Sequence, residues 1–150
     1  MGERIRKAWE VRVADFPPHI FYASTRGKAR YHAFLQAQWA WQGLRLTDVR
    51  VWRARWADVK LPNPNAAVEA LTQREREDLL HAYGADQGDP FKAGYRSYFY
   101  TADDCPVWNG MVDRGFAYRY RQDTGGTSFA LTDAGKRAAL SLVPEYGING

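Results

Sequence analysis

The residues best suited to bind a ligand lie in the segment 24–30, which carries three cations: Arg26, Lys28 and Arg30. Ser24 and Thr25 precede them, and both residue types favour the N-cap of a helix. The free N–H groups at a helix start attract anions. The segment therefore predicts an anion contact such as a nucleic-acid phosphate. The alternative is an exposed basic turn that is neutralised by Asp15 or Asp48.

Aromatic residues alternate with arginines in residues 51–56 (VWRARW) and again in residues 118–121 (YRYR). Exposed aromatic rings beside arginines can stack unpaired bases. The same alternation is typical of a strand with one buried and one solvated face, so both interpretations stay open. The nucleic-acid hypothesis assigns contacts to four arginines of these segments: Arg53, Arg55, Arg119 and Arg121.

The cations are unevenly distributed along the 150 residues. The net charge is +4, but the chain up to Ala57 carries eleven Lys/Arg against four Asp/Glu, and the rest carries ten against thirteen. The positive field therefore belongs to the N-terminal third, where it favours a polyanionic partner.

Several function classes lack the residues that they need. The three histidines are scattered and Cys105 has no second cysteine, so we expect no metal site. Asp103 and Asp104 oppose a reactive thiolate at Cys105. We predict no catalytic residue, cofactor or small-molecule ligand, and hence a non-enzymatic protein. The lone cysteine is typical of a reducing, cytoplasmic setting, and no apolar run approaches the roughly 18 residues of a membrane span.

Hydrophobic periodicity predicts a β-β-α-β unit over residues 3–57. Its elements are expected at residues 4–13 (strand), 19–23 (strand), 25–42 (helix) and 48–56 (strand). On the first strand, Ile5 is expected on the buried side and Arg6 on the solvated side. Val49 and Val51 share one side of the last strand and Trp52 and Trp56 the other, which leaves its buried face undecided.

The predicted helix at residues 25–42 has two unlike sides. Alanines gather on one of them: Ala29, Ala33 and Ala40. Large apolar side chains form an arc on the other: Tyr31, Phe34, Leu35, Trp39 and Trp41. We expect the aromatic arc to cover a small sheet.

Prolines at residues 62 and 64 predict a linker or ordered loop over residues 58–65. A second unit follows at residues 66–143, and residues 144–150 form a tail. Thr72 and Glu75 form a capping box for a helix that ends at Gly84. Further elements are expected at residues 93–100 (a short helix or a strand, with the helix favoured), 104–115 (helix), 116–122 (strand), 128–131 (strand) and from 132 onward (a helix capped by Thr132). The glycine pair at residues 125–126 is expected to form the tight turn of a hairpin between the two strands.

The second unit carries two phrases with a family likeness, residues 111–116 (MVDRGF) and 131–136 (LTDAGK). They resemble winged-helix domains of the multiple-antibiotic-resistance-regulator kind. The resemblance implies a hairpin wing and DNA binding. Alternation along the first wing strand places Arg119 and Arg121 on one face and Tyr118 on the other. Together the two units predict an α+β protein that binds nucleic acid.

A protein-interaction module is the alternative. The helix that reads DNA in that family begins here with Asp103 and Asp104, which would repel phosphates. The chain also resembles short bacteriophage-encoded proteins in residues 28–31 and 94–97, which implies a phage origin and fits an inhibitor of a host factor. Its partner contacts would be three tyrosines: Tyr95, Tyr98 and Tyr100.

Overall fold

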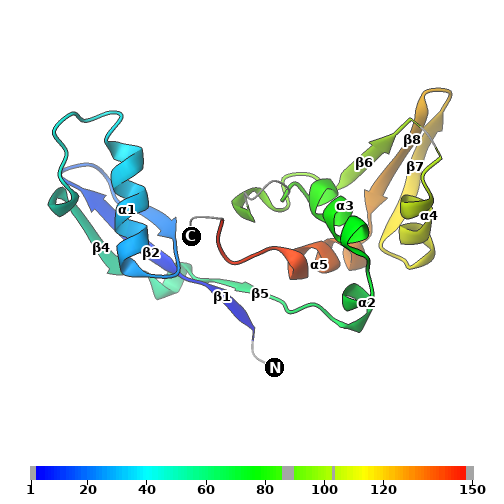
Figure 1. The fold of residues 1–150 in the computed structure, drawn as a ribbon, viewed down its shortest axis with the longest axis horizontal. Helices are drawn as coiled ribbons and strands as arrows, with labels where there is room; N and C mark the ends of the chain where they lie inside the picture. Colours follow the sequence, from blue (N-terminus) through cyan, green and yellow to red (C-terminus); the bar gives the residue numbers. More distant parts are fainter. Residues whose placement is uncertain (1–2, 86–89, 103, 148–150) are drawn as a thin grey trace. The chain divides into compact units, whose positions relative to one another are not determined.

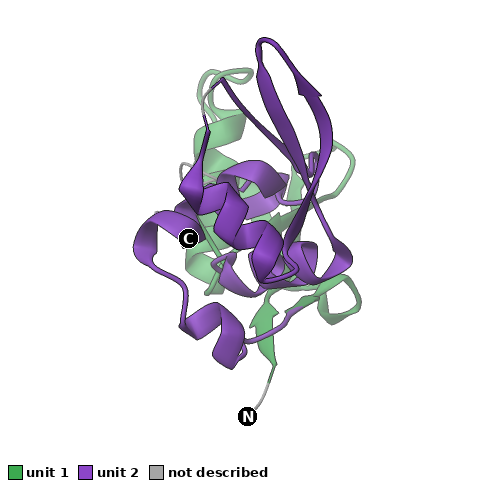
Figure 2. Cartoon of the chain, turned by 90° about the vertical axis from the view of Figure 1, so that its right-hand side faces the viewer, with its two compact units in different colours: residues 1–60, 145–150 green, residues 61–144 purple. Residues whose placement is uncertain are grey.

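The structure is a computed structural model that describes residues 3–85, 90–102 and 104–147 (Figure 1). It is α+β, with small antiparallel sheets and helices. The chain divides into two compact units, residues 1–60 with 145–150 and residues 61–144 (Figure 2). The division lies within residues 58–65, where the chain forms the strand β5 (Val59–Leu61) that pairs with β1 (Arg4–Arg6).

The N-terminal unit is built on a three-stranded antiparallel sheet with the strand order β3-β2-β4. Its strands are β2 (Ala8–Val13), β3 (His19–Tyr22) and β4 (Val49–Arg53). The helix α1 (Arg26–Ala37) packs on one face, and short 3-10 turns at Leu46–Asp48 and Arg55–Ala57 flank β4. Val11 lies opposite Val51, and Val13 opposite Val49. These valines lie on the helix-covered face, which decides that Trp52 is on the other.

The helix α1 begins as expected, because Thr25 Oγ1 accepts a hydrogen bond from Lys28 N at 3.2 Å. It ends at Ala37 instead of residue 42. The predicted orientation was wrong. Ala29 and Ala33 are buried against the sheet, whereas Tyr31 is exposed. Small side chains let the helix axis approach a valine-covered sheet closely. Of the arc of large side chains, Phe34 is half-buried and packs against this core, and the others are exposed: Tyr31, Leu35, Trp39 and Trp41.

The first strand also differs from the expectation. Lys7 interrupts it, because the Lys7 N–H donates to the Tyr146 hydroxyl at 2.9 Å. The alternation is reversed before this point, so Ile5 is exposed and Arg6 is buried. Arg6 Nε donates to the Glu145 carbonyl at 2.7 Å. Residues 145–146, expected as part of a tail, therefore join the first unit.

Among the described residues of the second unit, four helices contribute buried side chains to one core together with a sheet of order β6-β8-β7. Its elements in chain order are α2 (Ala66–Glu69), α3 (Gln73–Tyr83), a 3-10 turn (Pro90–Lys92), β6 (Tyr98–Thr101), α4 (Pro106–Asp113), β7 (Ala117–Asp123), β8 (Gly126–Leu131) and α5 (Asp133–Leu142). The fully buried Trp108 ring lies 4.7 Å from Phe99 and 5.6 Å from Phe129, measured between ring centroids. Aromatic packing therefore holds the centre of this unit.

The caps predicted for this unit are confirmed. Thr72 and Glu75 form the capping box, Gly84 ends α3 with φ +83°, and Thr132 Oγ1 accepts from Gly135 N. Of the two interpretations of residues 93–100, the favoured short helix is wrong, because Tyr98–Thr101 is the strand β6. The backbone of this segment pairs with β8, so β6 forms an edge strand of the sheet and β8 its central strand.

The hairpin of β7 and β8 is confirmed, with α4 before it and α5 after it. Among the described residues, α4 is the one helix between β6 and β7. Asp103 lies outside the described residues, and Asp104 accepts a hydrogen bond from Asn109 Nδ2 at 2.8 Å. The winged-helix assignment stays a prediction.

Candidate nucleic-acid interface

The N-terminal sheet has one face that α1 leaves open. Residues opposite each other on neighbouring antiparallel strands share a face, and here Arg12 pairs with Arg50 while Glu10 pairs with both Trp52 and Ile20. We call this set the arginine–tryptophan face: Glu10, Arg12, Ile20, Arg50 and Trp52. It combines cations with an exposed ring on one side of a sheet.

Trp52 is the centre of this face, with 45% of its surface exposed. The guanidinium carbons of Arg12 and Arg50 lie 5.5 Å and 5.9 Å from the ring centroid of Trp52, within cation–π range. An Arg12 guanidinium nitrogen also lies 3.1 Å from Glu10 Oε1. Two cations and an aromatic ring are therefore held side by side, with one carboxylate beside them.

The sequence analysis pointed to Arg53 and Arg55, but the structure separates them from this face. Arg53 donates to both carboxylate oxygens of Asp58, at 2.6 Å and 2.7 Å, and to the Ala8 carbonyl at 2.9 Å. The hydrogen bond to Asp58 raises the pKa of Arg53, against the effect of burial. Arg53 therefore ties β4 to the chain that follows it. Arg55 is exposed on the turn after β4.

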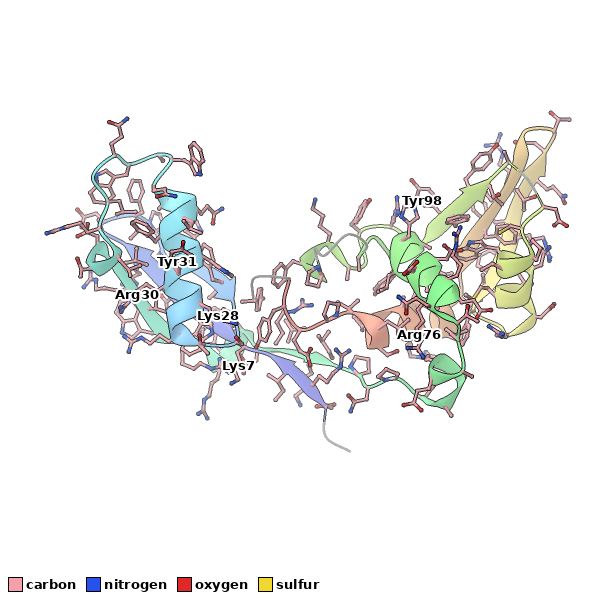
Figure 3. All side chains as sticks on the ribbon, viewed as in Figure 1. Lys7, Lys28, Arg30, Tyr31, Arg76 and Tyr98 are labelled. Carbon is pink, nitrogen blue, oxygen red and sulfur yellow. The ribbon has the colours of Figure 1, made fainter. Side chains whose placement is uncertain are left out.

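The three cations at the start of α1 lie on the helix-covered side of the sheet, and Figure 3 shows Lys28 and Arg30 along that helix. Arg26 and Lys28 are exposed and Arg30 is half-buried. Asp48 pairs with Arg45, accepting from Arg45 N at 2.8 Å. Over the described residues, no ion pair joins Arg26 to Asp15 or Asp48. These cations and the arginine–tryptophan face thus belong to opposite sides of one sheet.

The two wing arginines were expected on one face, and this was wrong. A register shift between Arg119 and Arg121 sends their side chains to opposite faces, because Arg119 pairs with Phe129 and Arg121 with Ser128. Arg119 lies over the Phe129 ring at 5.7 Å and donates to Asn109 Oδ1 at 2.5 Å. Arg121 lies 3.4 Å from Asp123. The wing therefore presents Arg121 alone of this pair on its open face.

The open face of the second sheet carries tyrosines. Tyr98 on β6 and Tyr118 on β7 both lie opposite Ala130, and Tyr100 lies opposite Ser128. We call this the tyrosine face: Tyr98, Tyr100, Tyr118, Ser128 and Ala130. Arg121, which lies opposite Ser128, is on the same side of the sheet. Each tyrosine is about half exposed, and Figure 3 marks Tyr98 on β6. Tyr95 lies outside the sheet, 5.6 Å from the Arg96 guanidinium.

Sequence reasoning missed Arg12, Arg50 and Tyr118 as surface partners. Their own strands alternate plainly, but alternation does not say which strands are neighbours. The pairing of β2 with β4 places Arg12 beside Arg50, and the pairing of β7 with β8 places Tyr118 near Tyr98. Register is the information that was lacking.

An apolar pocket of about 420 Å³ lies between the end of α1 and the strands β2 and β3. Phe16 and Trp41 line this pocket, with their ring centroids 6.3 Å apart, and His19 and Gln36 contribute polar atoms to the lining. Sequence patterns carry no signal for this pocket, because its lining comes from a strand pair, a loop and a helix end.

The comparisons with known proteins identify no relative: no family model, curated protein or solved structure matches the chain. Among the described residues, no three His, Cys, Asp or Glu side chains gather as a metal site would require. No described helix is long and apolar enough to cross a membrane. The two open sheet faces are therefore the basis for a functional assignment.

Proposed function

We propose that this protein binds nucleic acid through its N-terminal unit. The observation that carries the proposal is Trp52, exposed on an open sheet face with Arg12 and Arg50 on its ring. The unit holds twelve Lys/Arg against six Asp/Glu, whereas the second unit holds nine against eleven. A polyanion is therefore drawn to the first unit, and the arginine–tryptophan face gives it a place to bind.

The other predicted cations have supporting roles in this proposal. Arg26, Lys28, Arg30 and Arg55 lie away from the arginine–tryptophan face and add to the positive field that speeds association. Arg121 gives the proposed winged-helix unit one phosphate contact. We place the function in the cytoplasm, on the ground of the lone cysteine, and propose no catalytic step.

Salt dependence tests the proposal directly. Fluorescence anisotropy of a labelled 20-nucleotide single strand is measured at 50 mM and 200 mM salt, with the full chain. Arg12→Ala/Arg50→Ala should weaken binding at least about tenfold at the lower salt. It should also flatten the log–log salt slope by about 1.4, since each lost phosphate contact contributes about 0.7.

The matched control is Lys92→Ala/Arg137→Ala, which removes two exposed cations from the second unit. The net charge changes by the same amount, so an effect of overall charge would appear in both variants. Equal salt slopes for the two double variants would contradict a role for the arginine–tryptophan face. Circular dichroism establishes that each variant is folded.

A second candidate function is protein binding through the tyrosine face. Tyr98, Tyr100 and Tyr118 are half exposed on one side of a unit with a net charge of −2. Tyrosine is enriched at the energetic centres of protein interfaces. In this reading the chain is a phage-encoded inhibitor of a host factor. A pull-down from bacterial lysate tests this function. A partner recovered by the wild type but not by Tyr98→Ala/Tyr118→Ala would support it, and equal recovery by both would contradict it.

A further inference from the structure

We infer that the arginine–tryptophan face binds single-stranded nucleic acid, with one unpaired base stacked at Trp52 and the flanking phosphates held by Arg12 and Arg50. This inference rests on the proposed function and names its ligand. The face has the two components of a sequence-tolerant single-strand site, an aromatic platform and cations that follow the backbone.

The geometry fits a flat ligand with charged edges. Arg12 and Arg50 are cross-strand partners, and Trp52 is two residues beyond Arg50 on the same side of β4. Side chains two apart along a strand lie about 6.8 Å apart. Both guanidinium groups already rest against the indole ring. A base can therefore stack on the ring or on an adjacent guanidinium plane, while the other cation meets a phosphate.

The width of the sheet favours a single strand over a duplex. The major groove of B-DNA, about 12 Å wide, admits a helix or a two-stranded ribbon. Three strands about 4.8 Å apart, with their side chains, are wider than that groove. The bases of a duplex also present their flat faces to each other, so Trp52 would find no ring to stack on. An unpaired strand removes both obstacles.

Glu10 limits this binding. It is the one carboxylate of the arginine–tryptophan face, it lies opposite Trp52 and its Oε1 is 3.1 Å from the Arg12 guanidinium. A phosphate must compete with it for Arg12. Glu10→Gln keeps the size of the side chain and removes its charge, so it should tighten nucleic-acid binding. A platform that bound an apolar protein segment would show no such gain.

The test compares three labelled probes on the full chain at 50 mM salt: dT12, a 12-base-pair duplex, and a 12-unit abasic strand that has phosphates without bases. The wild type should bind dT12 at least about tenfold more tightly than either of the others. Trp52→Ala should weaken dT12 binding about fivefold to 140-fold, which corresponds to the 1–3 kcal/mol of one stacked base. It should leave abasic binding unchanged.

Two variants serve as controls. Trp52→Phe keeps an aromatic ring and should retain dT12 binding within about threefold. Trp56→Ala removes a more exposed indole that lies outside the face, on the turn after β4, and should have no effect. A thermal melt of each variant shows that it is folded.

The outcomes separate the inference from the proposed function. If Arg12→Ala/Arg50→Ala weakens binding but Trp52→Ala does not, or the duplex binds as tightly as dT12, the single-strand inference is overturned and the proposed function stands. If none of the three probes binds at 50 mM salt, both are overturned.

Discussion

The two units solve one architectural problem with different residues. Each has a three-stranded antiparallel sheet with one covered face, under α1 in the first unit and under several helices in the second, and one open face. The first open face carries two arginines around a tryptophan, and the second carries three tyrosines around Ser128 and Ala130. The same secondary-structure pattern therefore leaves the ligand open, and the uncovered faces differ in their side chains. Arginines lie on the indole ring of the first face, whereas tyrosines dominate the second, where Arg121 is paired with Asp123.

The covered faces differ as well. The first unit packs alanines of α1 on valines of the sheet, so its core is thin. The second packs Trp108 and Met111 of α4 on Phe129, with α3 and α5 adding further apolar side chains. The larger buried rings remove more apolar surface from water. We therefore expect the stability of the second unit to depend on single large side chains. The stability of the first unit should depend on the close approach of α1 to its sheet.

The largest effect is expected from Trp108→Ala. The indole is fully buried between Phe99 and Phe129, so its loss leaves a cavity and should lower the free energy of unfolding by about 3–5 kcal/mol. Amide hydrogen exchange followed by NMR should show lost protection in β8 with unchanged protection in β2. Equal losses in both strands would mean that the two cores are not independent, and the comparison would fail.

Close approach in the first unit is tested by enlarging an alanine. Ala29→Leu places three extra carbons between α1 and the sheet, where Ala29 has no exposed surface, and should cost about 1–3 kcal/mol. Ala33→Leu is the matched control, because Ala33 lines the 420 Å³ pocket and the added carbons have room there. Urea unfolding of both variants measures the difference. Equal costs would show that α1 does not rest on the sheet through Ala29 as described.

Local signals predicted much of this fold. Thr72 with Glu75, Gly84 and Thr132 fix helix ends through side chains or conformations that act within a few residues, and each was read correctly. The glycine pair at residues 125–126 likewise predicted the hairpin. The α+β class follows from these elements and the alternating strands.

The remainder depended on contacts between distant segments. Arg12 lies beside Arg50, 38 positions further along the chain, because of the β2–β4 register. The bulge that separates Arg119 from Arg121 has no local signature, because YRYR alternates without interruption. The buried side of α1 was predicted wrongly. Large apolar side chains gain most from burial, which favoured the aromatic arc, but the valine-covered sheet leaves room only for the small alanines. Surface sites that depend on strand register or on a β-bulge therefore could not be predicted from the sequence.

The smallest expected effect is electrostatic and comes from the ion pair between Arg53 at the end of β4 and Asp58. Removing this pair tests whether it anchors β4. The Asp58 carboxylate accepts hydrogen bonds from Arg53 and from the Ala8 N–H at 2.9 Å, and the Arg53 hydrogen bond holds the pKa of Asp58 below its ordinary value. A depressed carboxylate pKa contributes stability that is present above the unfolded pKa of about 3.9 and is lost as the pH falls through the folded value.

Asp58→Asn should therefore lower the stability of the first unit by about 1 kcal/mol at pH 7, near the upper end for solvent-accessible ion pairs.

Glu75→Gln is the counterpart in the second unit. Burial opposes ionisation of Glu75, but Arg114 at 2.8 Å and the Thr72 N–H hold its pKa low. Thermal melts from pH 7 to pH 2, followed by hydrogen exchange in β2 and α3, should show each variant flattening the acid loss of its own unit. If Asp58→Asn leaves the acid loss in β2 unchanged, the Arg53–Asp58 pair does not anchor β4. The arginine–tryptophan face would then owe its position to the β2–β4 ladder.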